Sequence, residues 1–211
     1  MKNIFKSNPT KKNKPGTIIV VSGLPRSGTS MMMKMLAEGG LPILTDSVRA
    51  VDEDNPNGYF EFEPVKQLSG GDVKWLVDAD GKVVKVISQL LEYLPSGHRY
   101  KILFMERDIK EVLASQRKML ERRQEQRQID DVEMEKQFRD HLQNVKFWLA
   151  RQPNMEVLYL NYNHLISSPS IFLMPIRDFI DAPLDIEKMK AVPTRDLYRN
   201  REQKSDPLPE D

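Results

Sequence analysis

"SGLPRSGTSMMMKM", residues 22 to 35, is a glycine-rich turn that runs into an apolar helical pattern. The phosphate-binding pattern G-x-x-x-x-G-K-[ST] fits it from Gly23 to Ser30, except that Thr29 stands where the lysine belongs. A turn opened by Gly23 and closed by Gly28 lets backbone N–H groups converge on an anion, and the positive end of the following helix adds to the attraction. The stretch therefore predicts an anion site that lacks the lysine of nucleoside triphosphatases.

The residues around this turn supply the strand and the helix that such a site needs. "TIIVVSG", residues 17–23, is short, apolar and β-branched, as expected of a fully buried strand. After the turn, methionines recur at helical spacing until Gly39 and Gly40 end the helix, and we expect them to pack against the sheet. Three further apolar runs predict buried strands at residues 82–87, 101–106 and 155–160.

Two helical patterns separate the later strands. One begins at Asp108, which can cap it, and the other spans about 130–151, with one apolar face formed by Met134, Phe138, Leu142, Val145 and Leu149. Strands that alternate with helices predict an α/β fold, a P-loop-type three-layer sandwich with a parallel sheet and helices on both faces. Ligands of such sheets bind at the carboxyl ends of the strands.

The rest of the chain divides simply. We expect a flexible basic tail at residues 1–16, one P-loop domain at 17–190, and a C-terminal segment with a polar tail at 191–211.

Composition excludes several function classes. The 211 residues include no cysteine, so disulfides, thiolate metal sites and a cysteine nucleophile are excluded. The three histidines, His98, His141 and His164, match no metal-ligand spacing. A net charge of +1 argues against a strongly basic nucleic-acid footprint. Because no stretch has the pattern of a signal peptide or a membrane span, we expect a cytoplasmic protein with no membrane span and no nucleic-acid partner.

Arg26 is the cation inside the glycine-rich turn. A planar guanidinium suits bidentate contact with a tetrahedral oxyanion, which favours a sulfuryl or phosphoryl group over a metal-bound triphosphate. Ser27 is a weak candidate for a nucleophile, since the G-x-S-x-G elbow is absent.

Three segments, in order, resemble the motifs of the sulfotransferases. "GLPRSGTS" resembles their 5′-phosphosulfate loop, P-[KR]-x-G-T-[TS], and looks most like the form of the tyrosylprotein and bacterial branches. "FMERDIKEVLASQRKML" resembles the 3′-phosphate element, with Arg107 at a strand end and Ser115 eight residues later. "LYLNYNHLISSP" is similar to the Y-E-[DQ]-[LM] segment, whose tyrosine lies by the adenine and matches Tyr162. Asn163 and His164 depart from the usual acidic residues.

This resemblance implies transfer of a sulfuryl group from 3′-phosphoadenosine 5′-phosphosulfate (PAPS) to a hydroxyl or amine acceptor, with no metal. The residues it assigns to the cofactor are Arg26, Ser27, Gly28, Thr29, Ser30, Arg107, Ser115 and Tyr162. Arg26 would also stabilise charge on the transferred group, and Lys85 matches a lysine that would add a second cation there.

The resemblance leaves the general base and the last cofactor contact open. Ile87 stands where the cytosolic branch has a histidine, so Asp46 and Glu61 are the candidates for the base. The R-K-G segment of that branch is missing, and the arginines that could replace it are Arg195, Arg199 and Arg201.

Plainer interpretations also remain. Arg107 can pair with a surface carboxylate, and Lys85 can be a surface lysine whose stem lies along apolar residues. The function classes that compete are a P-loop kinase or NTPase, disfavoured by Thr29, and a non-catalytic nucleotide-binding protein of the same fold. The sequence indicates neither the acceptor nor the oligomeric state.

Overall fold

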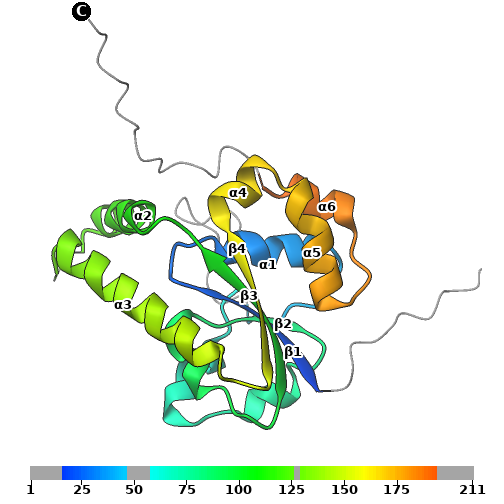
Figure 1. The fold of residues 1–211 in the computed structure, drawn as a ribbon. Helices are drawn as coiled ribbons and strands as arrows, with labels where there is room; N and C mark the ends of the chain where they lie inside the picture. The colour runs from blue at the N-terminus through cyan, green and yellow to red at the C-terminus, as the bar shows by residue number, and fades with distance from the viewer. Residues whose placement is uncertain (1–15, 47–57, 126–128, 194–211) are drawn as a thin grey trace, which may run out of the picture.

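A sheet of four parallel strands forms the centre of the fold (Figure 1). The computed structural model describes residues 16–46, 58–125 and 129–193. Its strands are β1 (Thr17–Gly23), β2 (Val83–Lys85), β3 (Arg99–Glu106) and β4 (Met155–Asn161). They lie in the order β2-β1-β3-β4, and each neighbouring pair is parallel. The predicted α/β fold and the four predicted strands are confirmed.

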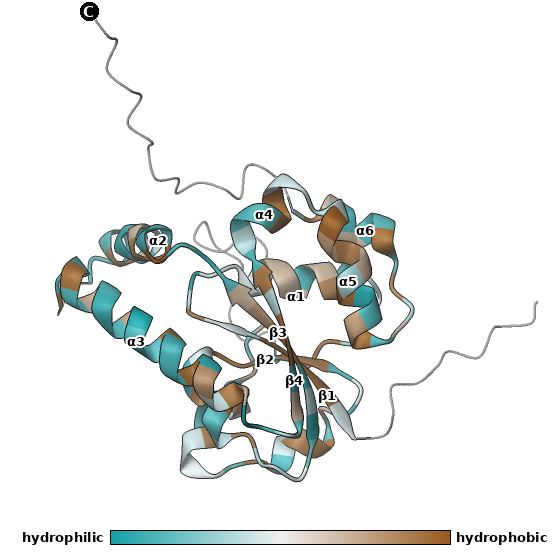
Figure 2. Ribbon diagram, in the orientation of Figure 1, coloured by the Kyte–Doolittle hydropathy of each residue, from teal (hydrophilic) through white to brown (hydrophobic). Residues whose placement is uncertain are grey.

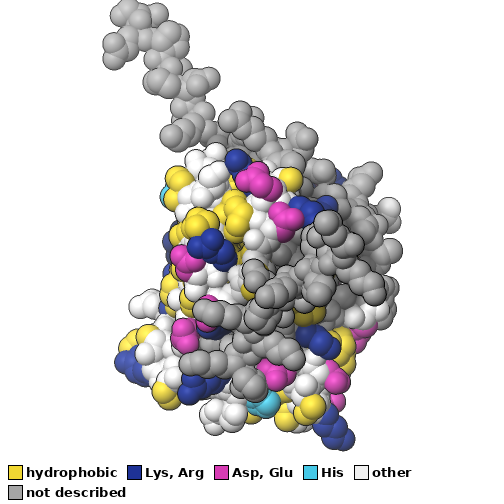
Figure 3. All heavy atoms as spheres, turned by 90° about the vertical axis from the view of Figure 1, so that its right-hand side faces the viewer, with side chains coloured by type: hydrophobic (Ala, Val, Ile, Leu, Met, Phe, Trp, Pro, Cys, Tyr) yellow, Lys and Arg dark blue, Asp and Glu magenta, His cyan; other side chains and the backbone are white. Residues whose placement is uncertain are grey.

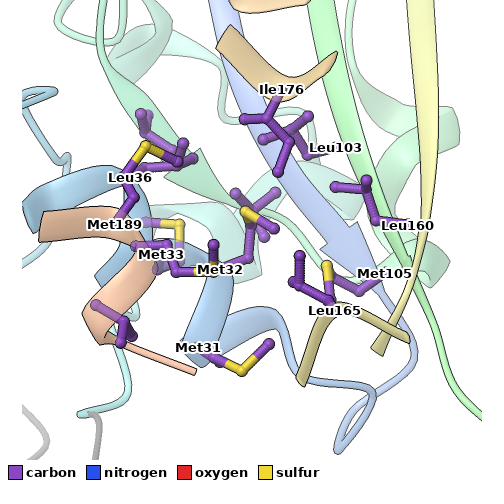
Figure 4. Packing of buried hydrophobic residues seen from close by; sticks show 14 of the residues in the cluster. Met31, Met32, Met33, Leu36, Leu103, Met105, Leu160, Leu165, Ile176 and Met189 are labelled. Carbon is purple, nitrogen blue, oxygen red and sulfur yellow. The ribbon is translucent and has the colours of Figure 1, made fainter. Parts of the chain in front are cut away.

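Each face of the sheet carries its own apolar core, because side chains alternate along a strand. Ile19 and Val21 of β1 belong to one core, which four helices cover: α1 (Thr29–Glu38), α4 (Tyr162–Ser167), α5 (Ser170–Ile180) and α6 (Ile186–Ala191). Met32 and Met33 of α1 lie in this core with Met189 of α6 (Figure 4). The methionines after the turn therefore pack against the sheet, as predicted.

The opposite face is covered by one long helix and three short ones. Ile18 and Val20 of β1 belong to this second core. Its covering elements are α3 (Asp131–Leu149) and the 3-10 helices η1 (Glu63–Gly70), η2 (Lys74–Val77) and η3 (Ser88–Tyr93). Figure 2 shows hydrophobic residues along the strands and hydrophilic residues on the outer sides of the helices. The molecule thus has the three layers that the sequence predicts.

Helix ends agree with the predicted capping residues. α2 (Ile109–Arg122) begins after Asp108, whose side chain accepts hydrogen bonds from the backbone N–H groups of Lys110 and Glu111. Gly39 caps the end of α1. The short 3-10 helices were not predicted, because their apolar residues are too few to show a helical period.

The apolar face of α3 is buried over only part of its length. Val145 and Leu149 are buried and Leu142 is partly packed against the second core, whereas Met134 and Phe138 remain partly exposed. The reason is that the N-terminal part of α3 extends beyond the sheet and lies alongside α2 (Figure 1).

The order of the strands reverses at β1. The chain leaves β1 through α1 to reach β2 on one side, and then crosses to β3 on the other. At this reversal Gly23 is paired with Met105, so the carboxyl ends of β1 and β3 lie next to each other. Such a reversal point is where open parallel sheets bind ligands.

Candidate functional site

The turn after β1 has a backbone that few residues tolerate. Gly23 has φ 142 and Gly28 has φ 101, both in the region that favours glycine. A Cβ on Gly23 would lie 2.5 Å from the carbonyl oxygen of Met105 and 2.5 Å from Ser27 Oγ. Arg26 has φ 72, a left-handed conformation that costs a non-glycine residue about 1 kcal/mol or more. Strain of this kind at a loop residue is typical of a functional position.

Tyr162 packs directly on this turn. A Cβ on Gly28 would lie 2.3 Å from Tyr162 Cδ2, so the ring occupies the space that a larger residue would need. Tyr162 is the first residue of α4, and Asn161 caps that helix by accepting a hydrogen bond from the N–H of His164 at 3.0 Å. The end of β4 is thereby joined to the turn that follows β1.

Arg26 connects the turn to α2. Its Nε donates a hydrogen bond to Ser115 Oγ at 3.0 Å, and Ser115 is 3% exposed. The first and the second of the three predicted motifs are therefore in direct contact.

Arg107, directly after β3, contacts Arg26, Glu111 and Tyr162. Its Nη1 donates to the carbonyl oxygen of Arg26 at 3.2 Å, and its Nε donates to Glu111 Oε2 at 2.9 Å. The guanidinium carbon lies 4.4 Å from the centre of the Tyr162 ring, within the range of a cation–π contact. The side chains of Arg107 and Glu111 are each 6% exposed, so the partner of Arg107 is a buried carboxylate and not a surface one.

We call the turn 23–30 together with Arg107, Ser115 and Tyr162 the strand-end site. It contains every residue that the sequence assigned to the cofactor. Three buried polar atoms here have no hydrogen-bond partner among the described residues: Ser27 Oγ, Arg107 Nη2 and Asn163 Oδ1. At its N-terminus α1 is capped by Gly28, which offers no side-chain cap, and the first turn of α1 carries no acid. Two buried donors beside a helix N-terminus suit a bound oxyanion.

The three other predicted residues form a second group at the end of β2, which we call the β2-end group: Asp46, Glu61 and Lys85. Lys85 Nζ donates to the carbonyl oxygen of Tyr59. The N–H of Asp46 donates to the carbonyl oxygen of Glu61 at 3.3 Å. Tyr59 and Glu61 belong to one segment, which therefore contacts both Lys85 and Asp46.

The two carboxylates of the β2-end group have different surroundings. Asp46 Oδ2 accepts a hydrogen bond from the N–H of Glu63 at 2.6 Å, and so helps to start η1. Glu61 is 25% exposed, with Oε2 3.7 Å from Lys66 Nζ. Lys66 also donates to the carboxylate of Glu63, and this hydrogen bond raises its pKa above the ordinary value.

The strand-end site and the β2-end group are connected by the pairing of β1 with β2. Lys85 is in register with Val21, two residues before Gly23. The predicted residues Arg195, Arg199 and Arg201 lie outside the described residues.

Two residues beside the strand-end site were not selected from the sequence. Glu111 follows Arg107 at the i,i+4 spacing of a helical ion pair, a signal that could have found it. Asn163 donates from Nδ2 to Glu111 Oε1 at 3.1 Å. It was noted only as a departure from the acidic residues of the motif, and no local pattern relates it to Glu111.

Among the described residues, no group of three or more histidine, aspartate and glutamate side chains could hold a metal ion. Within the same residues, no helix has the length and apolarity needed to cross a membrane. On the face shown in Figure 3, basic and acidic side chains are interspersed over the coloured part of the surface.

Comparison with known proteins finds similarity in structure alone. Neither the protein-family models nor the curated proteins match the chain. Among solved structures, the sulfotransferase domain of the curacin biosynthetic pathway is 16% identical, with a TM-score of 0.48, and the match covers 82% of this chain and 76% of that one. The sulfotransferase domain of the Synechococcus PCC 7002 olefin synthase is 15% identical, with a TM-score of 0.49, and covers 85% and 78%.

Retinol dehydratase, solved in complex with androsterone and the inactive cofactor PAP, is 16% identical, with a TM-score of 0.43, and covers 85% and 63%. The chain is similar in fold to these sulfotransferase domains, and at such identities its function has to be argued from its own residues.

Proposed function

We propose that this protein is a sulfotransferase that transfers a sulfuryl group from PAPS to a hydroxyl or amine acceptor. The observation that carries the proposal is the contact between two basic elements at one point: Arg26 binds Ser115 through its side chain and Arg107 through its carbonyl oxygen. A nucleotide with phosphates on both its 5′ and 3′ positions needs two such elements side by side. ATP needs one, together with the lysine that Thr29 replaces here.

The turn would bind the 5′ end of the nucleotide. Its backbone N–H groups and the N-terminus of α1 provide donors and a positive dipole for an oxyanion. Arg26 Nε is already bonded to Ser115, which fixes the side chain beside the turn. A cation preorganised there stabilises the charge that develops on the sulfuryl and bridging oxygens.

Arg107 and Ser115 would bind the 3′-phosphate, and Tyr162 would contact the adenine. The guanidinium of Arg107 has one buried nitrogen, Nη2, with no hydrogen-bond partner among the described residues. A charge-assisted hydrogen bond from such a nitrogen to a phosphate oxygen contributes about 1.5–3 kcal/mol.

The β2-end group would face the acceptor. Lys85 would add positive charge at the transferred sulfuryl group, and Asp46 or Glu61 would remove the acceptor proton. Asp46 Oδ2 accepts a hydrogen bond from the N–H of Glu63, and Glu61 Oε2 lies 3.7 Å from Lys66 Nζ. Both carboxylates are candidates for the base.

The direct experiment is transfer of label from [35S]PAPS to a panel of simple alcohols, phenols and amines in the presence of EDTA. The proposal predicts a labelled product whose formation is inhibited by adenosine 3′,5′-bisphosphate. Transfer from ATP that requires magnesium, with none from PAPS, would instead identify a P-loop kinase.

A further inference from the structure

Glu111 lies under the strand-end site with both of its oxygens occupied. Oε2 accepts from Arg107 Nε at 2.9 Å and Oε1 accepts from Asn163 Nδ2 at 3.1 Å. Glu111 comes from the first turn of α2, which follows β3, and Asn163 from the start of α4, which follows β4 (Figure 1). The carboxylate thus connects the ends of two neighbouring strands directly behind Arg107.

These contacts fix the guanidinium of Arg107 on several sides. Nε is held by Glu111, Nη1 by the carbonyl oxygen of Arg26, and one face of the group by the ring of Tyr162. The side chain is 6% exposed, and Nη2 is buried without a hydrogen-bond partner among the described residues. Arg107 therefore presents one defined donor to a ligand and has little freedom to present another.

Asn163 is oriented by the same carboxylate. A carboxylate can only accept hydrogen bonds, so the amide of Asn163 must turn its NH2 group toward Glu111. This leaves Oδ1 on the other side, buried and without a partner among the described residues. Asn163 in turn holds Glu111 through Oε1, the oxygen that Arg107 Nε does not contact.

The charges of Arg107 and Glu111 nearly cancel, since the pair is buried and in contact. By its charge alone, Glu111 would weaken phosphate binding, because its carboxylate would lie close to the bound anion and repel it. The attraction of Arg107 for a ligand must then come from the placement of Nη2, and that placement depends on Glu111.

We propose that Glu111, held by Asn163, is a positioning residue that sets the preference of this protein for nucleotides with a 3′-phosphate. This inference rests on the proposed function, because it assumes that Arg107 receives the 3′-phosphate. Glu111 acts through Arg107 and does not touch the nucleotide.

The test is calorimetric titration of adenosine 3′,5′-bisphosphate and of ADP into the parent protein and four variants. The quantity compared is the ratio of the two dissociation constants, which a general loss of stability does not change. Glu111→Ala should lower the preference for the bisphosphate about tenfold or more, since it releases the guanidinium. Glu111→Gln should keep more of the preference, because its amide oxygen can still accept from Arg107 Nε.

Asn163→Ala removes the support of Glu111 but leaves the ion pair intact, and should lower the preference a few-fold. If Glu111→Ala does not fold, Asn163→Ala becomes the deciding variant, because it leaves no buried charge without a partner. Glu121→Gln, an exposed glutamate of the same helix, is the matched control and should keep the parent ratio.

Several outcomes would overturn the inference. An increase in bisphosphate affinity in Glu111→Ala would mean that Glu111 acts only as an opposing charge. Equal losses for both nucleotides would mean a general structural role, and a parent ratio in Asn163→Ala would remove Asn163 from the arrangement. If the parent itself shows no preference, the proposed function fails and this inference fails with it. If the parent has the preference and both Glu111→Ala and Asn163→Ala keep it, this inference is wrong and the proposed function stands.

Discussion

The strand-end site and the β2-end group are held together by different kinds of contact. In the first, side chains bind one another: the half-buried Arg26 binds the buried Ser115, and the buried Arg107 binds Glu111. In the second, side chains bind backbone groups of the segments that follow β1 and precede β2, as Lys85 does with Tyr59. Buried side-chain pairs define a fixed geometry for one ligand, whereas backbone contacts among connecting segments allow the ligand to vary between proteins.

Replacing Arg26 should have the largest effect on the reaction. Arg26→Ala removes the cation at the transferred group and should lower turnover about 10²–10³-fold, as loss of an oxyanion donor does. Initial rates of label transfer from [35S]PAPS measure it, with the exposed Arg123→Ala as control. Turnover within a few-fold of the parent would remove Arg26 from the mechanism.

The carboxylates of the β2-end group should affect turnover without affecting the nucleotide. If Glu61 is the base, Glu61→Gln should lower kcat about 10²-fold or more, and Asp46→Asn should lower it less. Neither should change the dissociation constant of adenosine 3′,5′-bisphosphate by more than a few-fold. A large loss of bisphosphate binding in either variant would erase the distinction between the two regions.

Glycine substitutions test the rigidity of the strand-end site, with a glycine outside both regions as the control. Gly28→Ala combines a left-handed backbone with a clash against Tyr162, and should cost about 2–4 kcal/mol of unfolding free energy. Gly71→Ala, at the end of η1, has φ 83 and nothing within 4 Å of its new Cβ, so only the backbone strain of about 1–2 kcal/mol applies. Denaturant unfolding measures both. Equal losses would show that Tyr162 moves aside without cost.

The smallest expected effect is a pH dependence on the β2 side. His141 of α3 lies with Nε2 2.8 Å from Ser88 Oγ, and burial lowers the pKa of His141 below its ordinary value. The unfolded chain then binds this proton more readily than the folded one, so stability is present above about pH 6.5 and is lost as the pH falls below that value. His141→Gln should flatten the decline of Tm from pH 7.5 to 5.5, and the exposed His164→Gln should not. Parallel curves for the parent and His141→Gln would contradict this account.

Regular local patterns made most of the fold predictable. Apolar runs identified the strands, and Asp108 and Gly39 marked helix ends, because these signals act within a few residues. The motif around Arg26 predicted the turn for the same reason. The apolar face of α3 was also visible in the sequence, but the sequence does not show where the sheet beneath the helix ends.

The contacts inside the site were less predictable, because they join residues far apart in the chain. Arg26 and Ser115 are 89 residues apart, and Asn163 and Glu111 are 52 apart. No local period relates such positions, and only the order of the parallel strands brings them to one edge of the sheet. For this reason Asn163 became visible only in three dimensions, whereas the i,i+4 spacing from Arg107 was a sequence signal for Glu111.

The most direct test of the central claim, that the strand-end site recognises a 3′-phosphate, is a comparison of adenosine 3′,5′-bisphosphate with ADP by thermal denaturation in EDTA. The bisphosphate should raise the Tm of the parent well above any effect of ADP, because a ligand stabilises the folded state in proportion to its affinity. Arg107→Ala should lose most of this difference, worth about one to two decades of affinity, and keep the weaker effect of ADP. Equal stabilisation of the parent by both nucleotides would contradict the claim, and with it the proposed function.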